Sequence, residues 1–210
     1  MFERMKYDKL TIIGLPKKFK VYYALDYLYP DGQLPDNPDD ILYDEWPADG
    51  EEGEGAMMVY EYYKSATGVY AAYNETVHAL SFELSPWASD ADVSLYVKLV
   101  NAVLKKHPRA KLYAKYDILK GLTEEDEKKM IADRQSYVKR LLKTKDGFTM
   151  EGLFHGCTLK VAHLRPAPTL DIQARDLRQM FADMQWEKDK LTHEDLYSRK
   201  GAKYAKIPTE

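Results

Sequence analysis

Three consecutive stretches of aromatic and β-branched residues constrain the fold of this chain more than any other feature. They run over 57–64, 68–73 and 76–84, and only Ser65-Ala66-Thr67 and Asn74-Glu75 separate them. Residues of these types favour strands. Connections this short suit strands that follow one another in opposite directions, so the pattern predicts an antiparallel β-meander.

Amphipathic periodicity predicts about three helices that pack on these strands. The clearest helix has Ser89 in position to cap its N-terminus and Asp92 three residues later, and Pro108 stops it. The predicted helices cover 89–107, 123–146 and 170–188, and further short strands are predicted over 8–14, 111–116 and 157–165. We therefore expect a single α+β domain over residues 1–210, with a polar tail at 191–210.

The charges of the chain divide sharply between one early segment and the remainder. From Val21 to Tyr63 there is no Lys or Arg but there are 12 acids, whereas the rest of the chain holds all 31 basic residues and is net positive. Four prolines and four glycines interrupt residues 29–55, and prolines remove backbone donors. We expect an irregular acidic insertion at 21–55, although 17–29 fits either a strand or a helix.

Large rings accompany the carboxylates of this segment. Eight tyrosines and Trp46 lie between residues 21 and 63. Such rings often carry the binding energy of interfaces, and carboxylates speed the encounter with a basic partner. The pattern predicts a non-enzymatic surface that binds a basic protein, as a toxin-neutralising immunity or inhibitor protein does. The predicted contact residues are Asp39, Asp40, Tyr43, Asp44, Glu45 and Trp46. The alternative is that the rings pack on their own domain, against the lysines of 98–120.

One short segment offers residues for catalysis. In an extended segment His155, Cys157 and His163 share one side, and His155 and Cys157 would lie about 7 Å apart. This pair is the basis of an alternative hypothesis, a small hydrolase or transferase. The competing interpretation is that Cys157, Leu159 and Val161 fill a core face. The sequence has no CxxC, HExxH, GxSxG, EF-hand or phosphate-loop pattern, so we predict no metal site and no cofactor.

A third hypothesis is nucleic-acid binding through residues 98–120. This region carries seven basic residues against Asp117 alone, with Tyr113 and Tyr116 between them. Lysines that alternate with rings can follow phosphates and stack on bases. The whole-chain pI of about 6.0 argues against a dedicated nucleic-acid binder, so a protein partner is favoured over nucleic acid.

Several features bear on the location of the protein. No apolar run approaches the roughly 18 residues that a membrane span needs. Cys157 is the single cysteine, and residues 1–6 lack the basic-then-apolar order of a signal peptide. We expect a cytoplasmic protein with no membrane contact.

From about residue 78 to residue 207 the order of motifs resembles an uncharacterised bacterial family, a domain of unknown function. The resemblance is carried by Ser85-Pro86 ahead of Asp90, by Gln185, and by the terminal segment YSRKGAKYAK at 197–206. The first 77 residues do not share it, and the region of His155 to Cys157 departs from it. The resemblance implies no activity and assigns no site residues.

Overall fold

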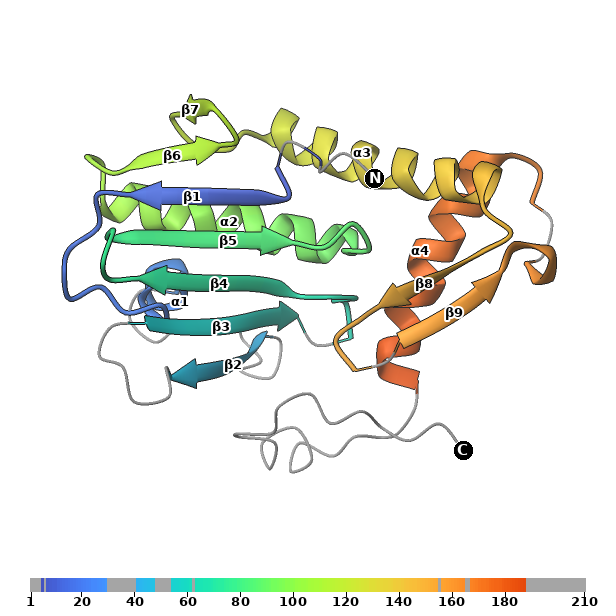
Figure 1. The fold of residues 1–210 in the computed structure, drawn as a ribbon, viewed down its shortest axis with the longest axis horizontal. Helices are drawn as coiled ribbons and strands as arrows, with labels where there is room; N and C mark the ends of the chain where they lie inside the picture. The colour runs from blue at the N-terminus through green and yellow to red at the C-terminus, as the bar shows by residue number, and fades with distance from the viewer. Residues whose placement is uncertain are drawn as a thin grey trace.

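A seven-stranded antiparallel sheet forms the centre of the protein (Figure 1). The computed structural model describes residues 5, 7–29, 41–47, 54–61, 63–154, 156–164 and 167–187, with the backbone alone for 41–47, 54 and 163. The strand order is β2-β3-β4-β5-β1-β6-β7. The strands are β1 (Lys9–Ile13), β2 (Ile41–Pro47), β3 (Glu54–Glu61), β4 (Val69–Asn74), β5 (Ala79–Leu84), β6 (Lys111–Ala114) and β7 (Asp117–Leu119). The predicted α+β class and the predicted meander, which is β3-β4-β5, are confirmed.

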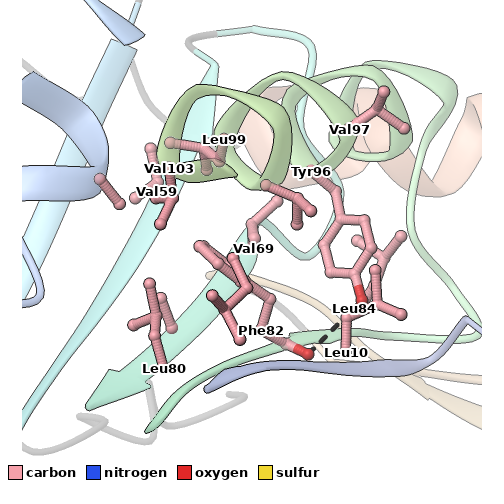
Figure 2. Packing of buried hydrophobic residues seen from close by; sticks show 14 of the residues in the cluster. Leu10, Val59, Val69, Leu80, Phe82, Leu84, Tyr96, Val97, Leu99 and Val103 are labelled. Atoms are coloured by element: carbon pink, nitrogen blue, oxygen red, sulfur yellow. Dashed lines mark hydrogen bonds between the residues drawn. The ribbon is translucent and has the colours of Figure 1, made fainter. Parts of the chain in front are cut away.

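Helix α2 (Asp90–Lys106) covers one face of this sheet. Its N-terminus has the predicted cap, because Ser89 and Asp92 bond to each other's backbone N–H. Apolar side chains alternate along the strands, as a sheet with one covered face requires, and those on the covered face meet α2 in the main core (Figure 2). Tyr96 is fully buried there, and its hydroxyl donates to the carbonyl of Tyr7 at 2.9 Å.

A second apolar cluster lies beside the sheet, where helices α3 (Glu124–Thr144) and α4 (Leu170–Glu187) meet the hairpin β8–β9 (Figure 1). Strand β8 covers Gly147–Glu151 and β9 covers Gly156–Lys160. Helix α3 connects the two clusters, because its Met130 packs in the main core and its Val138 packs in the second cluster. Trp87 lies at the centre of the second cluster, stacked on Phe148 with ring centroids 5.4 Å apart.

Two expectations for local structure are wrong. The segment 21–55 is not irregular throughout, because helix α1 (Tyr23–Leu28) and strand β2 form within it. Helix α1 forms because Ala24 and Leu25 are buried in the main core, and β2 forms because it pairs along its whole length with β3. The strand expected over 157–165 ends at Lys160 and continues as a short 3₁₀ helix, Val161–His163.

Among the described residues, no helix combines the length and the apolar character needed to cross a bilayer.

Candidate functional site

Four of the six predicted contact residues lie in strand β2. Tyr43, Asp44, Glu45 and Trp46 are the backbone partners of Val59, Met58, Met57 and Ala56 in β3. Asp39 and Asp40 lie outside the described residues. Strand β2 ends the sheet, since no further strand pairs with it in the part of the chain that the structure describes. Strand β2 is therefore an edge strand of the sheet.

The tyrosines that precede β2 pack on their own domain. Tyr22, Tyr23, Tyr27 and Tyr29 all lie half-buried against the main core. The Tyr27 hydroxyl lies 3.2 Å from His107 Nε2, and the Lys106 ammonium lies 5.8 Å from the centre of the Tyr27 ring. Packing on their own domain, as the alternative interpretation expected, therefore holds for these four rings, and Tyr27 meets the end of α2 within residues 98–120. They are not available in full to a partner.

This packing shifts the pKa of two of the groups involved. Burial raises the pKa of Tyr27 above its ordinary value of 10.0, and Tyr23 and Asp26 raise it further. Burial and the neighbouring Lys106 lower the pKa of His107 below its ordinary value of 6.5. His107 is therefore mainly neutral at pH 7, as a half-buried member of an aromatic cluster.

Cys157 has the position that the core-packing interpretation predicted. It is half-buried in β9, paired with Met150 of β8, and it packs with Leu159 and Val161 against the second cluster. Burial raises the pKa of its thiol above the ordinary value of 9.0, which disfavours the nucleophilic thiolate. His155 and the side chain of His163 lie outside the described residues. The described surroundings of Cys157 do not activate it.

A buried carboxylate that sequence reasoning treated only as a cap residue has a larger role. Asp92 is fully buried and accepts five hydrogen bonds. Three come from the successive backbone N–H groups of Ala66, Thr67 and Gly68, and two come from Ser89. The carboxylate thus ties the β3–β4 connection to the start of α2. All of its near neighbours are structural groups, so it is an anchor of the fold.

Two buried arginines also serve the fold. Arg134 is fully buried on α3, pairs with Asp8 at 3.2 Å and donates to the carbonyl of Ser85. Arg178 on α4 donates to the carbonyl of Ala88 and pairs with Asp90, both at 2.8 Å. Each arginine joins a long helix to the sheet or to the start of α2. Within the described residues, no three His, Cys, Asp or Glu side chains are grouped so that they could hold a metal ion.

The basic residues of 98–120 are all exposed, but the structure does not gather them in one place. Lys98 lies within α2 and Lys120 follows β7. Lys105, Lys106, Arg109 and Lys111 lie around the C-terminus of α2 and the start of β6. Lys115 lies at the turn between β6 and β7, next to Tyr116, whose side chain is 98% exposed.

A second basic run, which sequence reasoning did not connect with the first, lies at the same end of the sheet. Lys17, Lys18 and Lys20 are exposed in the connection between β1 and α1. Ile13, at the end of β1, is the register partner of Lys111, and the Phe19 ring lies 5.9 Å from the His107 ring. The two runs therefore form one basic end of the molecule, which consists of Lys17, Lys18, Lys20, Lys105, Lys106, Arg109 and Lys111.

Comparison of the chain with models of protein families, with curated proteins and with solved structures finds no match in any of the three.

Proposed function

We propose that this protein is a non-enzymatic protein-binding domain that holds a basic partner along strand β2. The observation that carries the proposal is the position of β2 at the edge of the sheet, within a segment of the chain that has acids and no Lys or Arg. An immunity or inhibitor protein that neutralises a basic toxin is the sharpest form of this proposal.

An edge strand supports binding through its backbone. One side of β2 is paired with β3, and N–H and C=O groups alternate along the other side of a strand. A partner strand can add to such an edge, with main-chain hydrogen bonds supplying affinity and side chains supplying specificity. Strand addition requires no cleft in the binding protein, only an accessible edge.

The charge of the edge supports a basic partner in particular. Proteins commonly protect an edge strand with charges, most often lysine, or with proline. Strand β2 carries Asp44, Glu45 and Pro47 and no base. Two copies of the same acidic edge repel each other, whereas a basic strand is attracted. The charge of β2 thus disfavours pairing between two copies of this chain and favours binding of a basic partner.

The test is charge reversal in the full-length chain. We expect a variant with Asp39, Asp40, Asp44 and Glu45 all changed to Lys to lose the partner that the wild type captures from native lysate, and to keep its melting temperature within a few degrees. A matched variant reverses four exposed acids elsewhere, Glu125, Asp146, Glu151 and Asp183. This variant should capture the same partner as the wild type.

Two outcomes contradict the proposal. One is a wild-type capture profile that does not differ from that of the edge variant. The other is equal loss of capture in both variants, which would mean that net charge and not the β2 edge is responsible.

A further inference from the structure

We propose that the basic end of the molecule binds single-stranded nucleic acid. The part of this surface at the start of β6 lies away from the β2 edge, because β1 and β6 are on the far side of the sheet from β2 (Figure 1). The inference does not depend on the proposed protein partner. It also departs from the expectation drawn from the pI, since a pI averages the whole chain and does not describe one end of it.

The structure brings the seven cations together from three separate segments. The connection 14–20 follows β1, residues 105–109 end α2, and Lys111 begins β6. Gly14, with a φ of +89°, turns the chain beside Ala110, and the Tyr73 hydroxyl of β4 donates to the Pro16 carbonyl at 2.9 Å. These contacts hold both basic runs at the same end of the sheet.

The cations of the basic end are not neutralised by the rest of the described chain. None of the seven forms an ion pair with a described acid. Among the side chains that the structure describes, the acids on the adjoining elements are Asp26, exposed on α1, and Glu75, in the turn between β4 and β5. Seven exposed cations against these two acids give the surface a positive field, and such a field attracts phosphates.

Half-buried rings lie between these cations. The Lys20 ammonium is 5.7 Å from the centre of the Tyr22 ring, and Lys106 stands over Tyr27. Tyr22 and Tyr23 pack edge to face with centroids 4.8 Å apart, which fixes the orientation of the Tyr22 ring. A fixed ring beside a phosphate-binding cation is the arrangement on which unpaired bases stack.

The combination of clustered cations and half-buried rings favours single-stranded nucleic acid over other anionic partners. A duplex keeps its bases stacked, so rings add nothing to its binding unless a side chain enters a groove. An anionic membrane would require apolar side chains that insert into it. The large apolar side chains exposed at this end among the described residues are Ile13, at 42%, and Val77, at 59%, and two aliphatic side chains offer little area for insertion.

The binding is measured by fluorescence anisotropy with labelled oligomers of deoxythymidine and of uridine, from 50 to 200 mM salt. We expect the wild-type Kd to rise steeply with salt. Lys105→Glu, Lys106→Glu and Arg109→Glu together should raise Kd at least tenfold and reduce the slope of log K against log salt by about 2, since each phosphate contact in a single strand contributes about 0.7. A control with the same change in net charge is Lys129→Glu, Arg140→Glu and Lys143→Glu, all exposed on α3. It should retain most of the affinity.

A second variant separates stacking from simple attraction between charges. Tyr22→Leu keeps an apolar side chain but removes the ring, so it should weaken binding of the oligomers several-fold and leave binding of inorganic polyphosphate unchanged. The inference is overturned if the wild type fails to bind at 50 mM salt, or if the two triple variants lose affinity equally. It is also overturned if the Tyr22 variant binds oligomers as the wild type does, or if vesicles rich in phosphatidylserine bind more tightly than the oligomers. A protein that binds oligomers but captures no basic partner would refute the function proposed for β2 and leave this inference intact.

Discussion

Removal of the Asp92 carboxylate is the perturbation whose cost the structure defines best. This side chain is fully buried and accepts hydrogen bonds at 2.8–3.1 Å from Ala66, Thr67, Gly68 and twice from Ser89. In Asp92→Ala the three backbone donors of the β3–β4 connection lose their acceptor in a place that water does not reach. Each orphaned donor costs about 1–3 kcal/mol.

The expected loss follows from the number of donors. At about 1 kcal/mol for each of the three orphaned backbone donors, with about 1 kcal/mol more for the Ser89 N–H, which also loses its acceptor, Asp92→Ala should lower the free energy of unfolding by about 4 kcal/mol or more. A whole domain is commonly stable by about 5–15 kcal/mol, so this is a large share. Asp92→Asn is nearly isosteric and keeps one oxygen acceptor. Its amide group then faces one donor such as the Gly68 N–H, which predicts a smaller loss of about 1–3 kcal/mol.

Urea denaturation followed by circular dichroism measures both losses. The control is Glu125→Gln, an exposed acid in the first turn of α3, whose loss should stay below about 1 kcal/mol because it removes only an interaction with the helix dipole. The reasoning is wrong if Asp92→Ala costs less than about 1 kcal/mol with an unchanged m-value. It is equally wrong if Asp92→Asn costs as much as Asp92→Ala, since the retained acceptor would then have no value.

Three further predictions follow from single contacts. Because burial and Lys106 lower the pKa of His107, the unfolded chain binds its proton more tightly than the folded chain. Stability should therefore fall as the pH drops from the ordinary pKa of 6.5 towards the lower folded pKa. The urea midpoint of His107→Gln should depend less on pH in this range than that of the wild type. Parallel pH profiles of the two proteins would contradict the assignment. Burial raises the pKa of the Cys157 thiol, so a maleimide should label the folded protein slowly at pH 7 and the unfolded protein quickly in urea. Rapid labelling of the folded protein would instead support the hydrolase or transferase hypothesis. A Cβ on Gly152 would overlap the buried amide of Gln185, so Gly152→Ala should cost about 1–3 kcal/mol, and a double-mutant cycle with Gln185→Ala should show a coupling that independent sites would lack.

The long helices were predictable because their signals are local. Ser89 with Asp92 and Thr123 with Asp126 each form a capping box, a contact between residues three apart. The meander was predictable for a similar reason, since its connections are short. The partner-binding residues and the His155–Cys157 pair remain hypotheses, because the structure describes only part of each.

Structure in the segment 21–55 was not predictable from local signals. Helix α1 depends on Tyr27 meeting His107, which is 80 residues away in the sequence. Strand β2 depends on pairing with β3 across an acidic stretch with several prolines and glycines. Charges and prolines show that regular structure is disfavoured locally. They do not show that a neighbouring strand supplies the hydrogen bonds that stabilise it.

By itself, the amino-acid sequence determined the α+β class, the helices α2, α3 and α4, the meander, and the division of charge between an acidic segment and a basic remainder. Each of these depends on residues that are near one another in the chain, because hydrophobic periodicity and helix caps involve only neighbouring residues. The tertiary structure decided that β1 lies between β5 and β6, and this placement brings Lys17–Lys20 beside the end of α2. It also decided that Asp92 is an anchor and that the tyrosines of α1 lie half-buried against the main core. Contacts between distant segments are selected by burial and hydrogen bonding of the whole chain, which no single stretch of sequence encodes.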